Sequence, residues 1–135
     1  MVTETLGEVV PGLIESDLTE QIIGSAVAIH QHLGPGLLES AYQACMCHEL
    51  ASRRIPFRSQ MDLPVRYKGL QLDCGYRLDF VVDQRVVVEL KSVERLTAVH
   101  EAQLMTYLRL SGIRVGLLIN FNVPVLRRGI LRRVL

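Results

Sequence analysis

Asp79, Glu89 and Lys91 place two carboxylates and an ammonium in two neighbouring segments, 78–82 and 86–91, that are rich in Val and Phe. Such segments are typical of strands in a core, where an unpaired charge is costly. Two carboxylates about 5 Å apart, the spacing of a cross-strand pair, repel each other unless a proton or a cation lies between them. Oxygen donors favour a hard ion, so these residue types predict a site for Mg²⁺ or Mn²⁺.

Lys91 adds a positive charge beside the second carboxylate. Side chains alternate along a strand, so Glu89 and Lys91 share one face, opposite to that of Leu90. A lysine at this position can steer a water molecule or offset negative charge that develops during a reaction. Two acids and a lysine around Mg²⁺ are equipped to hydrolyse a phosphodiester. The alternative is a surface hairpin whose cross-strand salt bridge contributes less than about 1 kcal/mol, and the three residues alone leave both interpretations open.

The length of the turn between the two strands decides whether the carboxylates meet. A three-residue turn at 83–85 places Asp79 opposite Glu89, on the same face of the hairpin. A two-residue turn at 83–84 would place the two side chains on opposite faces, and the site would disappear. The functional interpretation therefore predicts the three-residue turn.

Three motifs of the chain resemble those of a known group of enzymes. Asp79 with Glu89-Leu90-Lys91 resembles the signature of the PD-(D/E)xK nuclease superfamily. The segment 36–42, Gly-Leu-Leu-Glu-Ser-Ala-Tyr, is similar to the motif of the GxxExxY proteins, a prokaryotic family placed in that superfamily. The segment 103–107, Gln-Leu-Met-Thr-Tyr, resembles the Q-h-x-x-Y element of RecB-type nucleases. Order and spacing match over nearly the whole chain, with one departure: Leu78 stands where the superfamily name has Pro, at a position that bears no ligand.

The resemblance implies a restriction-endonuclease-like fold of the α/β class, with a mixed β-sheet flanked by helices. It also implies a metal-dependent nuclease that hydrolyses phosphodiester bonds in nucleic acid, DNA in preference to RNA. The alternative is a non-catalytic module that retains this fold to bind nucleic acid or a protein. The intact set of two acids and a lysine favours the enzyme, because binding alone does not require carboxylates and their charge hinders contact with phosphates. Endonuclease and exonuclease action both stay open.

The same resemblance assigns the metal ligands. Asp79 and Glu89 would hold Mg²⁺ or Mn²⁺, with the backbone carbonyl of Leu90 and waters completing the coordination. Glu39 would hold a second ion or a metal-bound water. From the residues alone, Glu39 faces an apolar arc of its helix and needs a partner, and the alternative is that it satisfies free amides in the first helical turn. Tyr42, on the same face, is expected to be a core aromatic with a hydrogen-bonded hydroxyl.

Lys91 would position the attacking water and offset charge in the transition state. Gln103 and Tyr107, four residues apart on a helix, would orient substrate or water. The alternative for this pair is a buried structural hydrogen bond between amide and phenol. His100, on the same helix face, is expected to be a half-exposed structural residue.

Basic residues gather in the last third of the chain. No acidic residue follows Glu101, yet six arginines do, among them Arg127, Arg128, Arg132 and Arg133. These four are candidates for contact with nucleic-acid phosphates beside an acidic metal site. The alternative is that they balance the acidic N-terminal part, within the monomer or across a dimer.

Composition indicates one globular domain. The chain has 135 residues, a net charge of +1, 49% hydrophobic and 21% charged residues. Its apolar runs are too short for a membrane span, and its N-terminus does not resemble a signal peptide. Three cysteines argue against a disulfide framework and fit a reducing cytoplasm. The chain leaves little room for a separate recognition domain, so a homodimer or a partner protein is an alternative source of recognition.

Residues 1–16 are expected to form a lead-in, and 17–135 a single nuclease-like domain. A helix is predicted to start at Asp17, with Glu20 completing a capping box. The remaining expected elements are a helix over 37–54, a strand over 57–63, a turn at 67–69, strands over 70–82 and 86–91, a helix over 97–110, and strands over 113–121 and 129–135.

Overall fold

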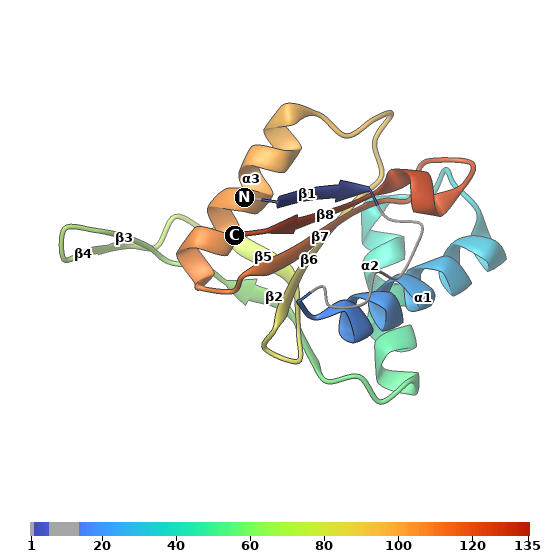
Figure 1. Ribbon diagram of the computed structural model, residues 1–135, viewed down its shortest axis with the longest axis horizontal. Coiled ribbons are helices and arrows are strands. Elements are labelled where there is room, and N and C mark those ends of the chain that lie inside the picture. Colours follow the sequence, from blue (N-terminus) through green and yellow to red (C-terminus); the bar gives the residue numbers. More distant parts are fainter. Residues whose placement is uncertain (1, 6–13) are drawn as a thin grey trace.

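A six-stranded mixed sheet forms the centre of the computed structural model, which describes residues 2–5 and 14–135 (Figure 1). The strand order is β1-β8-β7-β6-β5-β2, with β6 and β7 parallel and every other pair antiparallel. The strands are β1 Val2–Thr5, β2 Phe57–Asp62, β5 Arg77–Val82, β6 Val86–Lys91, β7 Val115–Asn120 and β8 Ile130–Val134. Since β1 pairs with β8, part of the expected lead-in adds an edge strand to the sheet; the boundary at residue 16 stays a prediction.

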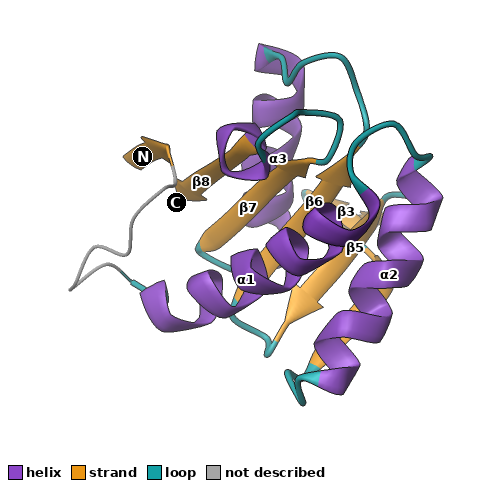
Figure 2. Cartoon of the chain, turned by 90° about the vertical axis from the view of Figure 1, so that its right-hand side faces the viewer, coloured by secondary structure: helices purple, strands orange, loops and turns teal. Residues whose placement is uncertain are grey.

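Helices cover both faces of the sheet (Figure 2). Helices α1 (Ser16–Leu33) and α2 (Glu39–Ser52) lie on one face, and α3 (Ala98–Ser111) lies on the other. A short 3-10 helix, η1 (Leu126–Gly129), precedes β8. The predicted α/β class with a mixed, helix-flanked sheet is confirmed. None of the described helices combines the length and the apolar content needed to cross a membrane.

The central strand β6 explains why this part of the sequence is so apolar. Because helices cover both sides, a central strand carries an almost continuous apolar run. Val88 packs in the core under α1 and α2, whereas Val87 packs with Leu104 and Leu108 of α3. Side chains alternate, so the odd-numbered positions of β6, including Glu89, face α3.

The expected long strand over 70–82 is wrong. Strands β3 (Val65–Tyr67) and β4 (Leu70–Leu72) form a separate hairpin that extends from the body, and β5 starts only at Arg77 (Figure 1). The intervening residues include Asp73 and Gly75, types that are depleted in strands. Gly75 has a φ of 76°, which an extended strand does not allow.

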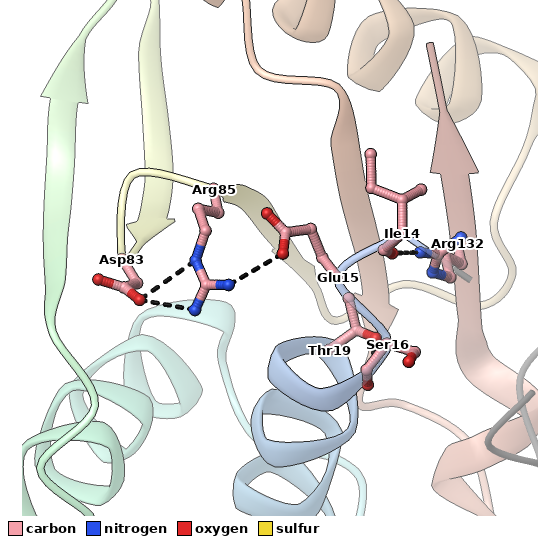
Figure 3. Close-up of polar contacts among 7 residues, drawn as sticks. All are labelled: Ile14, Glu15, Ser16, Thr19, Asp83, Arg85 and Arg132. Carbon is pink, nitrogen blue, oxygen red and sulfur yellow. Dashed lines mark hydrogen bonds and ion pairs between the residues drawn. The ribbon is translucent and has the colours of Figure 1, made fainter. Parts of the chain in front are cut away.

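The predicted cap of α1 is also wrong. The N-cap residue is Glu15, in a left-handed conformation with a φ of 57°, and no side chain caps the helix. Tertiary contacts hold this end instead (Figure 3). Glu15 pairs with Arg85 at 2.9 Å, and the carbonyl of Ile14 accepts a hydrogen bond from Arg132. The start of α1 is therefore held by the β5–β6 turn and by β8 rather than by its own residues.

Helix α3 begins and ends close to the prediction. Thr97 is the N-cap, and its side chain accepts a hydrogen bond from the His100 backbone N–H. His100 Nδ1 in turn accepts the Thr97 N–H at 3.0 Å, which confirms the expected structural role of this half-buried histidine. Gly112 ends the helix in the left-handed region, at a φ of 74°.

Candidate functional site

The β5–β6 turn has three residues, as predicted. Val82 pairs with Val86, and the ladder continues through Phe80 opposite Val88. The next position in this register brings Asp79 opposite Glu89. The confirmed turn length therefore places both carboxyl groups on one side of the hairpin.

At this point between β5 and β6, side-chain carboxylates accept the hydrogen bonds of backbone N–H groups in place of backbone carbonyls. The Asp79 N–H donates to Glu89 Oε2 at 2.7 Å, and the Leu90 N–H donates to Asp79 Oδ2 at 2.8 Å. In a continued ladder the Leu90 N–H would face Leu78; here it binds the Asp79 side chain. The two side chains are consequently held close together by their own strands, before any ligand binds.

Burial and mutual repulsion make this pair hard to ionise. Glu89 is only 4% exposed. Burial, followed by the charge of Asp79, raises the pKa of Glu89 to about 8. Burial also raises the pKa of Asp79, although the hydrogen bond from Leu90 and the charge of Lys91 oppose the shift. At neutral pH the pair therefore retains a proton unless a cation compensates the second charge.

Lys91 lies beside the pair, as its position in the strand predicts. It is half-buried, and its ammonium lowers the pKa values of Asp79, Glu89 and Glu39. Because a single ammonium acts on all three carboxyl groups, the three residues of the signature and Glu39 form one electrostatic cluster.

Glu39 is the first residue of α2 and is half-buried. Burial raises its pKa, the nearby Lys91 and His100 lower it, and Asp79 raises it further. Among the described residues, no backbone amide donates to its carboxylate. The side chain is thus directed toward the β5–β6 cluster, and the expected alternative of helix capping is not observed.

Tyr42, in contrast, has the structural role that was expected. It is fully buried, and its ring stacks on Phe121 at 4.3 Å between centroids. Its hydroxyl donates to the Gly34 carbonyl at 2.6 Å and accepts the Leu37 N–H at 3.2 Å. Tyr42 therefore fixes the loop before α2, and with it the position of Glu39.

Two polar residues of the site were not identified from the sequence. Hydrogen bonding from Gln43 lowers the pKa of Asp79, and Gln43 also accepts a hydrogen bond from Gln60 at 2.6 Å. Gln43 follows Glu39 by four residues on α2, and that spacing was the available signal. Asn120, at the end of β7 beside Lys91, is buried and binds both the N–H and the carbonyl of Val93, at 3.1 and 3.0 Å. It fastens the loop that follows Lys91.

Helix α3 contributes Tyr107 to the edge of the site. Tyr107 is buried; burial raises the pKa of its phenol, and the charges of Glu89 and Asp79 raise it further. Gln103 is exposed and lines a cavity with Tyr107. No hydrogen bond between the two is present, so the expected alternative of a buried amide–phenol bond is not observed.

Three of the four C-terminal arginines have partners within the chain. Arg127 pairs with Glu20 at 2.8 Å, and Arg133 pairs with Glu101 at 2.8 Å. Arg132 and Arg133 are 1% and 4% exposed. The two ion pairs favour charge balance within the monomer for Arg127 and Arg133, and Arg132 donates to the Ile14 carbonyl, whereas Arg128 is exposed.

The donor set fits one hard cation. Leu90 directs its N–H toward β5, and the N–H and C=O of one residue leave a strand on the same side, so its carbonyl faces the pair as well. Two carboxylates and a carbonyl are oxygen ligands of the kind that Mg²⁺ and Mn²⁺ prefer. These three groups are therefore the candidate donors. The side chains alone do not make such a site, since the described residues contain no group of three or more His, Cys, Asp or Glu placed to hold a metal ion.

Comparison with known proteins points in the same direction as the geometry. A family model described as the PD-(D/E)XK nuclease superfamily matches residues 16–134, nearly all of the chain. No curated protein and no solved structure matches the chain. The matched region contains Asp79, Glu89 and Lys91, together with all the helices that surround them.

Proposed function

This chain belongs to the PD-(D/E)XK nuclease superfamily, and from that premise we propose that it is a metal-dependent nuclease acting on nucleic acid, DNA in preference to RNA. One observation carries the proposal: a buried carboxyl group, Glu89, and a half-buried one, Asp79, accept hydrogen bonds from each other's strands, with an ammonium beside them. A structural salt bridge does not require the second carboxylate, whose burial and repulsion are costly. A bound cation would offset that cost, and cation binding would explain why two carboxyl groups lie together here.

Asp79, Glu89 and the carbonyl of Leu90 would hold Mg²⁺ or Mn²⁺. The ion would supply Lewis-acid polarisation of the scissile phosphate. Glu39, directed at the same cluster from α2, would hold a second ion or a water at its edge. The hydrogen bond from Gln43 lowers the pKa of Asp79 and would favour the carboxylate form that binds a cation.

Lys91 positions the attacking water and offsets the charge that grows on the phosphate oxygens. The nearby carboxyl groups of Glu39, Asp79 and Glu89 attract the Lys91 ammonium and would hold it close to the phosphate. Gln103 and Tyr107 orient the substrate from the α3 side. Of the four C-terminal arginines, Arg128 is the exposed one and would contact phosphates.

Further details follow from the sequence motifs. The segment 36–42 places the chain with the GxxExxY proteins inside the superfamily. The three cysteines of the chain are free, as expected for a protein that acts in the reducing cytoplasm: Cys45, Cys47 and Cys74. A homodimer or a partner protein would supply substrate recognition that a chain of 135 residues has little room for.

Cleavage by site variants tests this proposal. We expect wild-type protein to cut at least one of a panel of single-stranded, duplex and branched substrates with Mn²⁺, and none with EDTA. Asp79→Asn and Lys91→Ala should lower the rate by about 100-fold or more, since each removes an electrostatic contact to the reacting groups.

Asp83→Asn is the matched control. Asp83 lies in the turn of the same hairpin and pairs with Arg85 at 2.7 Å. This variant should cleave like wild type. Full activity in well-folded Asp79→Asn would remove the pair from the mechanism. Equal DNA binding with and without Mn²⁺ and no cut product from any substrate would instead favour the non-catalytic module.

A further inference from the structure

A cavity of about 430 Å³ lies next to the candidate site, between α3 and the base of the β3–β4 hairpin. It is lined by Val65, Tyr76, Gln103, Thr106, Tyr107 and Leu110. Its volume is in the range of sites that bind small organic groups. The catalytic carboxylates do not line it, so its occupant would sit beside the reacting phosphate and not on the metal donors.

Tyr107 connects the cavity to the carboxylates. Its ring lines the cavity, and its phenol is close enough to Glu89 and Asp79 for both charges to raise its pKa. Tyr107 therefore lies between the cavity that it lines and the carboxylates whose charges act on it. That is the arrangement expected for a neighbouring part of the same substrate.

Two aromatic rings form one wall. Tyr76 and Tyr107 meet edge to face, with centroids 6.5 Å apart and planes at 61°. The Tyr76 side chain is 46% exposed, yet its backbone carbonyl is held by the Leu63 N–H at 2.9 Å. An exposed ring on a fixed backbone offers a face for stacking at little cost in conformational entropy.

The polar groups of the lining are neutral. Gln103 is exposed, and its amide has no hydrogen-bond partner in the described part of the chain. A glutamine amide both donates and accepts, as the edge of a nucleobase does. The lining contains no charged residue. The lining residues themselves offer a phosphate no counter-charge, and the neighbouring Arg109 guanidinium already donates to Thr106 Oγ1 at 3.1 Å. A flat, neutral, hydrogen-bonding ring would find suitable partners.

We propose that this cavity binds one unstacked nucleobase next to the scissile phosphate, so that the preferred substrate is single-stranded or frayed nucleic acid. The inference rests on the proposed nuclease function, whose substrate class it names. A base within a duplex would first have to leave its stack, which costs a few kcal/mol. Stacking on the tyrosine wall, with the Gln103 amide at the base edge, would hold the base once it is free.

The test measures binding and not cleavage, with oligonucleotides that carry a single 2-aminopurine in single-stranded or duplex form, in EDTA. Tyr76→Ala should weaken single-strand binding by about 10-fold, the loss expected for one stacked base, and should abolish the quenching of 2-aminopurine. Tyr76→Phe should retain both, since it keeps the ring. Binding of the duplex should change less than that of the single strand.

Tyr67→Ala is the matched control, because Tyr67 is an exposed tyrosine (61%) in the same hairpin but does not line the cavity. It should leave affinity and quenching unchanged, and far-ultraviolet circular dichroism should show that every variant folds. Equal single-strand binding by Tyr76→Ala and wild type would overturn the base site even if the protein cleaves DNA. Absence of binding to any oligonucleotide would overturn it too. Base binding without cleavage under Mn²⁺ would retain the site and reject the nuclease.

Discussion

At the scale of one residue, Glu89 is a carboxyl group whose burial in the sheet lowers the stability of the fold. It lies between valine-rich strands and is 4% exposed. One N–H, from Asp79, donates to its carboxylate at 2.7 Å. That bond and the charge of Lys91 favour the ionised form, but burial and the neighbouring Asp79 outweigh them and raise the pKa to about 8. The metal-free protein therefore holds a proton where the proposed metal site would need a negative charge.

This pKa predicts how stability varies with pH. Between the ordinary value of 4.5 and about 8, native Glu89 keeps a proton that the unfolded chain has released. The free energy of unfolding of the metal-free protein should therefore fall as pH rises through that window and level off above it. Asp79 and Glu39, whose pKa values are also raised, act in the same direction. Urea denaturation in EDTA across the window measures the slope.

Glu89→Gln should remove most of that slope and raise the free energy of unfolding near pH 8 by on the order of a few kcal/mol, at about 1.4 kcal/mol per pKa unit. The same variant should lose Mn²⁺ binding, because the amide cannot replace a carboxylate. Glu94→Gln, a change at an exposed loop carboxyl, is the control and should keep the wild-type slope. A wild-type protein whose stability does not vary over this window would contradict the burial of an uncompensated pair.

At the scale of elements, the close packing of α3 on β7 sets the position of Tyr107. Gly116 is the second residue of β7 and lies beneath α3. A Cβ at this position would lie 2.9 Å from Leu104 Cδ1 and 3.2 Å from Leu108 Cδ2. Those two side chains come from the turns of α3 on either side of Tyr107. The helix can approach the sheet this closely because residue 116 has no side chain.

Gly116→Ala should push α3 away from the sheet and destabilise the fold by about 1–3 kcal/mol, the usual cost of overpacking a core. Cleavage should fall as well, since Tyr107 moves with the helix. Gly24→Ala in α1 is the control, because its Cβ would meet only Arg53 Nη1, at 3.4 Å. That variant should be neutral or stabilised by up to about 1 kcal/mol. Equal denaturation midpoints for the two variants would show that α3 does not depend on close contact at this glycine.

At the scale of the whole molecule, the charges of the C-terminal arginines are largely used inside the fold. Arg127 of η1 reaches Glu20 of α1, and Arg133 of β8 reaches Glu101 of α3. These pairs connect η1 and β8 to helices on opposite faces of the sheet. The net charge of +1 thus gives little attraction for nucleic acid over the molecule as a whole, and contact with phosphates depends on individual exposed residues.

Arg128 and Arg133 should therefore respond differently to replacement. Arg128→Ala should leave stability unchanged, weaken nucleic-acid binding, and reduce the slope of log affinity against log salt by about one. Arg133→Ala should lower the free energy of unfolding by about 1–3 kcal/mol, because the buried guanidinium loses its ion pair with the partly exposed Glu101 and its hydrogen bond to the Arg132 carbonyl. Its salt slope should match wild type. A reduced salt slope in Arg133→Ala at full stability would show that Arg133 contacts phosphates.

The sequence by itself was sufficient for the features that depend on residues close together in the chain. Strand alternation reduced the meeting of Asp79 and Glu89 to a choice between two turn lengths, because a shift of one residue moves a side chain to the other face. The functional interpretation predicted the three-residue turn, and the register of β5 and β6 confirms it. Thr97 and Gly112 marked the ends of α3 for the same reason, since helix caps are local. The family motifs then supplied the fold class.

Tertiary structure decided what depends on contacts between distant segments. The start of α1 is held by Arg85 and Arg132, and Gln43 reaches Asp79 from another element. The burial of Arg133 and the cavity beside Tyr107 likewise form only when helices pack on the sheet. The local sequence pattern specifies the backbone conformation of an element and the face on which each side chain lies. The partner of a long polar side chain depends instead on which other elements the packing of the core brings close to it.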